Sequence, residues 1–112
     1  MTTEPRLKTG LWVAAALRLG MHANQPGVVV RKGDEDAGGV LVKLHGRNGD
    51  MVLSPFQGQE GERTWLRATG PEPVPEAAAD AYIDKQLQFD PDLWVIEFEA
   101  PAYLPPFEGK IV

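Results

Sequence analysis

The stretch Val28–Ser54, VVVRKGDEDAGGVLVKLHGRNGDMVLS, decides the fold of this chain. It contains three short apolar runs, and these predict strands at Val28–Lys32, Val40–His45 and Asp50–Ser54. Asn48-Gly49 separates the last two runs, and Asn-Gly favours a type I′ turn because both central residues need positive φ. We therefore expect two successive hairpins that form a three-stranded meander.

The segment before this stretch predicts a helix at Lys8–Asn24, which ends at Asn24-Gln25-Pro26-Gly27. A helical wheel places its apolar residues on one side, namely Trp12, Ala16, Leu19 and Ala23, with Val13 and Leu17 beside them. Lys8, Arg18 and His22 fall on the opposite side. We expect Trp12→Ala to be the most damaging single change in this helix, because a buried large side chain contributes about 1.5–3 kcal/mol.

The segment after the stretch supplies a strand at Glu62–Thr69, a second helix at Pro75–Phe89 and a last strand at Asp92–Glu99. The predicted order is α-β-β-β-β-α-β. It indicates an α+β protein with a twisted, mainly antiparallel sheet of about five strands and two helices. We expect both helices on one face of the sheet, because each has one apolar stripe.

One domain is expected over residues 1–112, the usual size of a single domain. Residues 1–7 are a loose lead-in in this interpretation. Residues 100–112 form a proline-rich tail that we expect to pack on or beside the sheet, for example as an edge strand, because it carries several apolar side chains.

Composition excludes several chemistries. The chain has no cysteine, so disulfides, Cys-ligated zinc, iron–sulfur clusters and thiol nucleophiles are absent, and no cofactor motif is present. Its two histidines alone do not make a usual structural zinc site. The longest apolar run, Leu11–Leu17, is too short to span a bilayer, and we expect a cytoplasmic location.

The formal net charge of −5 is concentrated in residues 70–112, which carry nine acidic and two basic groups. This balance disfavours non-specific binding to phosphates, which requires a basic surface.

The order and spacing of four segments resemble a family of small uncharacterised alphaproteobacterial proteins known only as a domain of unknown function. The segments are Arg6-Leu7-Lys8 with Trp12-Val13, the run RKGDEDAGGVLVK at 31–43, Trp65 before Gly70-Pro71, and FDPDLWVIE at 89–97. The resemblance covers about residues 6–99. It implies a small α+β bacterial protein without an established activity, and no catalytic or binding residue is implied by it.

The first candidate site is acidic. Asp34, Glu35 and Asp36 lie in a glycine-rich loop, and such clustered carboxylates suit Ca²⁺ or Mg²⁺, which prefer oxygen ligands. Asp90 and Asp92 could complete a two-carboxylate site with this loop if the fold brings them together. The alternative is that these acids cap turns in solvent, and the calcium-loop pattern fails because its twelfth position is His45.

The second candidate site is basic. Alternation places Lys43 and His45 on one strand face, and it places Arg63, Trp65 and Arg67 on another. If the two faces coincide, they form a basic surface with an aromatic centre, which can hold single-stranded nucleic acid. The alternative is the ordinary polar face of a half-exposed sheet.

Three classes of function follow. We favour a non-enzymatic binding or protein-interaction module that acts on an unknown protein partner or as a homodimer, away from membranes. A small enzyme dependent on a divalent metal, with the acidic loop as its site, is the alternative. A weak single-stranded nucleic-acid-binding sheet is the second alternative, disfavoured by the acidic charge.

Overall fold

The structure is a computed structural model that describes residues 8–57 and 63–112. The helices are α1 (Thr9–His22) and α2 (Glu76–Phe89). The strands are β1 (Gly27–Arg31), β2 (Val40–Gly46), β3 (Gly49–Gln57), β4 (Arg63–Arg67), β5 (Trp94–Glu99) and β6 (Lys110–Ile111). The predicted order α-β-β-β-β-α-β is confirmed, and the tail adds a sixth strand. The predicted lead-in at 1–7 lies outside the described residues.

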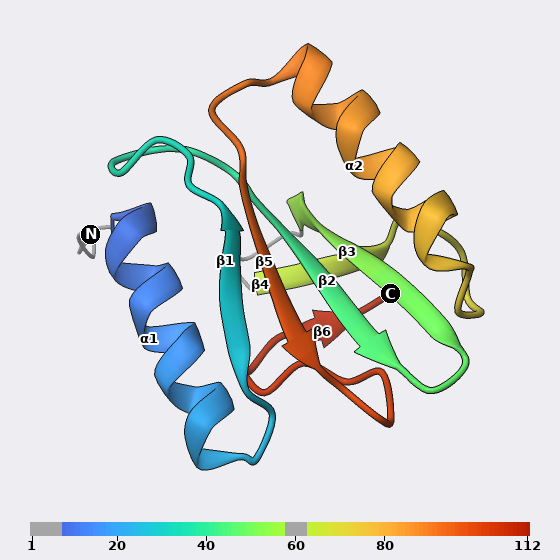
Figure 1. The fold of residues 1–112 in the computed structure, drawn as a ribbon. Helices are drawn as coiled ribbons and strands as arrows, with labels where there is room; N and C mark the ends of the chain where they lie inside the picture. The colour runs from blue at the N-terminus through green and yellow to red at the C-terminus, as the bar shows by residue number, and fades with distance from the viewer. Residues whose placement is uncertain (1–7, 58–62) are drawn as a thin grey trace.

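All six strands form one mixed sheet in the order β1-β5-β2-β3-β4-β6 (Figure 1). The pairs β2–β5 and β4–β6 are parallel, and the other pairs are antiparallel. The prediction that Val28–Lys32 and Val40–His45 form a hairpin is wrong, because β5 lies between them. Side chains on both faces of β5 are apolar, so this strand is stabilised by an interior position in the sheet.

The second predicted hairpin, between β2 and β3, is confirmed, but its turn differs from the prediction. Gly46 pairs with Gly49, so Arg47 and Asn48 are the loop residues. Among the residues of this turn, only Gly49 has a positive φ, at 123°. A Cβ at Gly49 would also lie 2.3 Å from the carbonyl oxygen of Val74, so the close approach of two chain segments requires glycine here.

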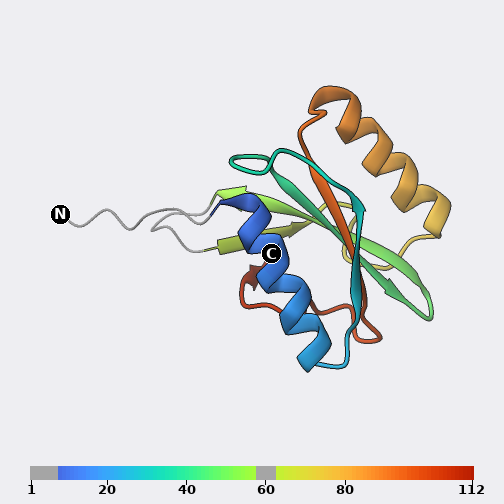
Figure 2. The same ribbon diagram turned by 60° about the vertical axis from the view of Figure 1, so that its left-hand side comes forward.

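The helices cover opposite faces of the sheet (Figures 1 and 2). On the α1 face, Val13 and Ala16 of α1 pack with alternate strand residues, which are Val40, Val42, Leu44, Met51, Leu53, Trp65, Trp94, Ile96 and Phe98. On the α2 face, Ala79 and Ile83 of α2 pack with Leu41, Val52, Leu93 and Val95. The expectation of both helices on one face is wrong. β2 and β5 carry apolar side chains on both faces of the sheet, so a helix is needed on each face to bury them.

The buried side of α1 is rotated from the predicted one. Val13, Ala16 and Gly20 are buried, whereas Leu19 is 46% exposed. A Cβ at Gly20 would lie 2.8 Å from the ring of Phe98, so the helix contacts the sheet through its smallest residues. The predicted side therefore included the buried residues Val13 and Ala16 but not Gly20.

The tail closes the far edge of the sheet. β6 pairs with β4, where Val112 N–H donates to Trp65 O and Arg67 N–H donates to Val112 O. Phe107 is buried against the rings of Trp12 and Trp65, with centroid distances of 5.1 and 5.3 Å. Within the described part of the chain, neither helix is long and apolar enough to cross a membrane.

Candidate functional site

The predicted acidic loop forms turns with its own backbone. Oδ2 of Asp34 accepts hydrogen bonds from the N–H groups of Asp36 and Ala37. Glu35 and Asp36 are exposed and form ion pairs with Lys32 and Lys8, at 3.2 and 3.6 Å. These contacts fit the alternative interpretation, in which the acids stabilise a turn at the protein surface.

The turn at Asp90–Asp92 does lie beside this loop, as the candidate site requires. Asp34 N–H donates to Asp92 O, and the indole N–H of Trp94 donates to Asp34 O at 2.7 Å. Neither contact involves a carboxylate, and Oδ1 of Asp90 accepts the N–H of Asp92 within its own turn. In residues 8–57 and 63–112, these acids do not form a group of three ligands close enough to share a metal ion. A cation site at these acids stays a prediction.

The predicted basic surface is not assembled, because the two strand faces do not coincide. Lys43 and His45 lie on the α2 face, whereas Trp65 and Arg67 lie on the α1 face by their register with Leu53 and its neighbours. Trp65 is only 2% exposed and belongs to the core. The side chain of Arg63 lies outside what the structure describes.

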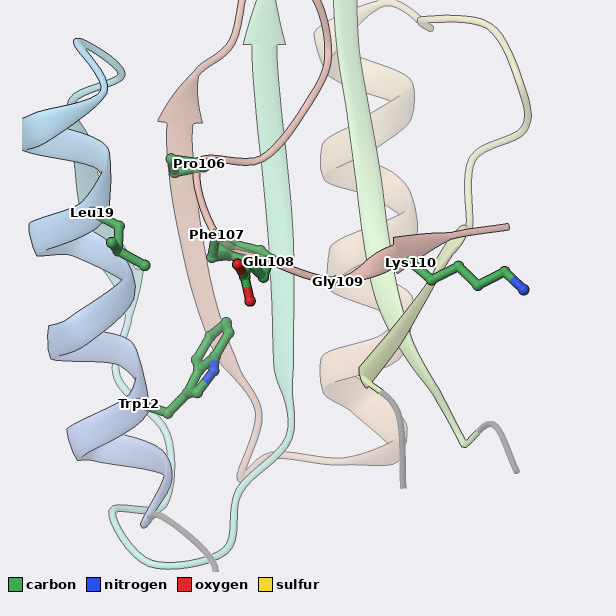
Figure 3. A pocket seen from close by; sticks show the side chains of 7 residues that line it. All are labelled: Trp12, Leu19, Pro106, Phe107, Glu108, Gly109 and Lys110. Atoms are coloured by element: carbon green, nitrogen blue, oxygen red, sulfur yellow. The ribbon is translucent and has the colours of Figure 1, made fainter. Parts of the chain in front are cut away.

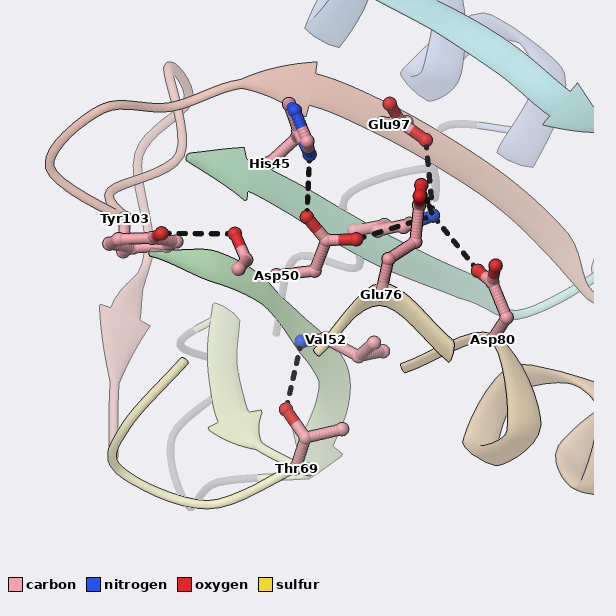
Figure 4. Close-up of polar contacts among 10 residues, drawn as sticks. His45, Asp50, Val52, Thr69, Glu76, Asp80, Glu97 and Tyr103 are labelled. Atoms are coloured by element: carbon pink, nitrogen blue, oxygen red, sulfur yellow. Dashed lines mark hydrogen bonds and ion pairs between the residues drawn. The ribbon is translucent and has the colours of Figure 1, made fainter. Parts of the chain in front are cut away.

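The structure reveals a different polar site on the α2 face, shown in Figure 4. We call it the Lys43 cluster, and it consists of Lys43 and His45 from β2, Asp50 from β3, Glu76 and Asp80 from α2, and Glu97 from β5. The β2–β3 and β2–β5 registers place the four strand residues of the cluster next to one another, and the first turns of α2 add Glu76 and Asp80.

Lys43 is the centre of this cluster. Its side chain is 6% exposed, and Nζ lies 2.9 Å from Asp80, 3.1 Å from Glu76 and 3.5 Å from both Asp50 and Glu97. Burial disfavours the charged ammonium, but hydrogen bonds to Asp80 and Glu76 and the charge of Glu97 outweigh it. The pKa of Lys43 is therefore raised above its ordinary value, and the residue is a permanent cation.

Asp50 is the most buried charged group of the cluster. Its side chain is inaccessible to solvent. Its backbone forms two hydrogen bonds with Val74, which hold the segment just before α2 against β3. Oδ1 accepts a 2.6 Å hydrogen bond from Nδ1 of His45. Oδ2 receives no hydrogen bond from the described residues.

The hydrogen bond to Asp50 raises the pKa of His45 above its ordinary value. Desolvation opposes this shift, while the negative charges of Asp50, Glu99 and Glu97 add to it. The imidazole is 42% exposed, so its second nitrogen can exchange protons with solvent.

This shift predicts a pH dependence of stability. Because the folded pKa lies above the unfolded one, the protonated imidazole stabilises the fold fully below the unfolded value of 6.5, and this stabilisation is lost as the pH rises through the folded pKa. As the pH rises above 6.5, the wild-type protein should lose stability relative to His45→Gln, as measured by urea unfolding. Equal pH dependence of the two proteins would show that Asp50 does not stabilise the imidazolium.

Two surface depressions adjoin α1. A broad groove of about 830 Å³ lies between α1 and the tail, where Trp12 and Leu19 face Phe107 and Glu108 while Lys110 points away (Figure 3). A shallower depression of about 430 Å³ lies over the outer side of α1, lined by Leu11, Ala14, Ala15, Arg18, Leu19 and His22. Leu19 is shared by both, so one apolar surface runs along the helix.

Sequence reasoning found two members of the Lys43 cluster and misread their environment. Lys43 shares a face with Leu41 in a strand that is apolar on both faces, and such a strand is covered on both sides. That pattern was a signal that Lys43 would be buried and would need acidic partners. Asp50 was predicted only as the first residue of a strand, and the two acids from α2 come from a helix that is 33 or more positions away from Lys43.

Fold and site define a small α+β protein whose six-stranded mixed sheet carries a buried charge cluster on one face and an apolar helix on the other. A family model described as "Protein of unknown function (DUF1491)" matches residues 7–108. The chain therefore belongs to the DUF1491 family, as the resemblance to alphaproteobacterial proteins implied.

Solved relatives have the same fold. A crystal structure of a DUF1491 family protein from Caulobacter crescentus CB15 is 33% identical, covers 96% of this chain and 100% of its own, and has a TM-score of 0.83. An NMR structure of a DUF1491 family protein from the same organism is 32% identical, covers 97% of this chain and 99% of its own, and has a TM-score of 0.82. The solution structure of protein Atu0922 from A. tumefaciens is 26% identical, covers 92% of this chain and 93% of its own, and has a TM-score of 0.77. None of the curated proteins compared with the chain matches it.

Proposed function

We propose that this protein is a non-enzymatic interaction module that acts as a homodimer, joined through the outer side of α1. The observation that carries the proposal is a set of exposed apolar residues with helical spacing, which we call the α1 stripe: Leu11, Ala15 and Leu19. Leu11 is 59% exposed, and nothing in the described part of the chain covers it.

The α1 stripe favours a second copy of the chain over another partner because it is self-complementary. Two antiparallel copies of α1 related by a two-fold axis at Ala15 bring Leu11 of each copy against Leu19 of the other. Ala15 lines the outer depression and has a small side chain, so the two helices can approach closely there.

The same symmetry also matches the flanks of the stripe. Arg18 of one copy lies opposite Trp12 of the other, and a guanidinium over an indole ring is a favourable cation–π pair. The neighbouring edge strand β1 (Figure 2) adds Val29, which is 41% exposed and pairs with Ile96 on the α1 face.

The test is the mass of the protein in solution and its response to Ala15→Arg. Light scattering should give twice 12.3 kDa for the wild type and 12.3 kDa for Ala15→Arg, because the change places two like charges at the two-fold axis beside Arg18. Arginine is a good helix former, so the monomer should keep its stability. Phe89→Arg is the matched control, since Phe89 is 76% exposed at the end of α2, and it should remain a dimer.

A wild-type mass of 12.3 kDa at the highest attainable concentration would refute the homodimer. A dimer that survives Ala15→Arg would refute its location on α1. The expected cytoplasmic location belongs to the same proposal, and the absence of cysteine supports it.

A further inference from the structure

We infer that His45, Asp50 and Glu76 form a binding site for a divalent transition-metal cation of the zinc type. One ligand atom from each of these side chains lies within 4.8 Å of the other two. The three residues come from β2, β3 and the first turn of α2, so the fold itself brings them together. This site differs from the acidic loop at Asp34–Asp36, which the sequence indicated.

Asp50 supplies an observation that is independent of this proximity. Its carboxylate is fully buried, yet Oδ2 receives no hydrogen bond within the described chain. The nearest cation is the ammonium of Lys43, whose 3.5 Å ion pair lacks the geometry of a hydrogen bond. A buried carboxylate oxygen without a donor is costly, and a metal ion bound to it would remove that cost.

The charges of the Lys43 cluster favour an additional cation. Four carboxylates surround one ammonium, so the cluster carries an excess of three negative charges while His45 is neutral. A divalent cation lowers this excess to one. Lys43 does not have to leave the cluster when the cation enters, because Asp80 at 2.9 Å and Glu97 at 3.5 Å remain its partners.

The types of ligand decide the class of metal. One imidazole nitrogen and two carboxylate oxygens suit Zn²⁺, which commonly accepts three protein ligands and a water molecule. Mg²⁺ and Ca²⁺ prefer oxygen ligands alone, so they should bind this set weakly. Binding at Nδ1 of His45 displaces the proton that lies between this nitrogen and Asp50. A neutral imidazole then carries its one proton on Nε2, whereas an imidazolium releases one proton to solvent.

Isothermal titration calorimetry of the chelator-treated full chain with ZnCl₂ or MgCl₂ measures the affinity, and NMR of the ¹⁵N-labelled imidazoles identifies the ligand. We expect Zn²⁺ to bind in a one-to-one ratio with a large shift of the His45 Nδ1 resonance, while the His22 resonances stay unchanged. MgCl₂ should give no comparable heat.

Glu76→Gln is the decisive variant, because Glu76 is 60% exposed and its loss should not unfold the protein. It should weaken Zn²⁺ binding at least about tenfold, since even the loss of an outer partner of a metal ligand costs 10–100-fold. Asp84→Asn, an exposed acid two turns further along α2, is the matched control and should bind Zn²⁺ like the wild type.

Three results would overturn the inference: no saturable Zn²⁺ binding, an unchanged His45 resonance in the presence of bound Zn²⁺, or equal loss of affinity in Glu76→Gln and Asp84→Asn. The homodimer is tested separately, because the α1 stripe and the Lys43 cluster lie on opposite sides of the sheet.

Discussion

Lys43→Met should lower the free energy of unfolding by about 3 kcal/mol, because it removes the ammonium beside Oδ2 of the buried Asp50 carboxylate. Methionine retains most of the apolar stem of lysine, so the loss comes from charge and not from a cavity. Glu76 and Asp80 are more than half exposed, and water can replace the ammonium around them at little cost. Urea unfolding at neutral pH measures the difference.

A second variant separates the cost of a lone charge from the value of the pair. Lys43→Met combined with Asp50→Leu removes both buried charges, and replacing a buried ion pair with apolar residues is often neutral. The double variant should therefore be more stable than Lys43→Met alone. A double variant less stable than the single one would show that the ion pair itself stabilises the fold.

Trp65→Ala should cost about 3–5 kcal/mol, the largest loss expected from a single truncation in this protein. Trp65 is 2% exposed, and its ring lies 5.7 Å from that of Trp12 and 5.3 Å from that of Phe107. Its removal leaves a cavity between the sheet, α1 and the tail. The midpoint and slope of urea unfolding give the loss of stability.

Trp12→Ala is the informative comparison, because Trp12 was expected to be the most important residue of its helix. Trp12 is only partly buried and borders the groove beside the tail, so water can fill the space left by its ring. Its truncation should cost less than that of Trp65. If Trp12→Ala costs as much or more, the core on the α1 face depends on the helix rather than on β4. Leu66→Ala, at an exposed position of the same strand, should have little effect.

The candidate sites show how far local patterns reach. The acids at Asp34–Asp36 and Asp90–Asp92 stood out because they are close in sequence, and close spacing is also what a turn-capping residue needs. The residues of the Lys43 cluster are spread along the sequence from Lys43 to Glu97. Only strand pairing and the docking of α2 place them together, so no spacing in the sequence could identify them.

The sequence by itself determined the elements, their order, the β2–β3 hairpin and the family, because propensity, turn residues and apolar periodicity are local properties of the chain. Only the tertiary structure decided that β5 enters between β1 and β2, that the helices cover opposite faces, and that Lys43 is buried among acids while Trp65 joins the core. These features depend on which surfaces exclude water together, and that choice is made by contacts between segments distant in sequence.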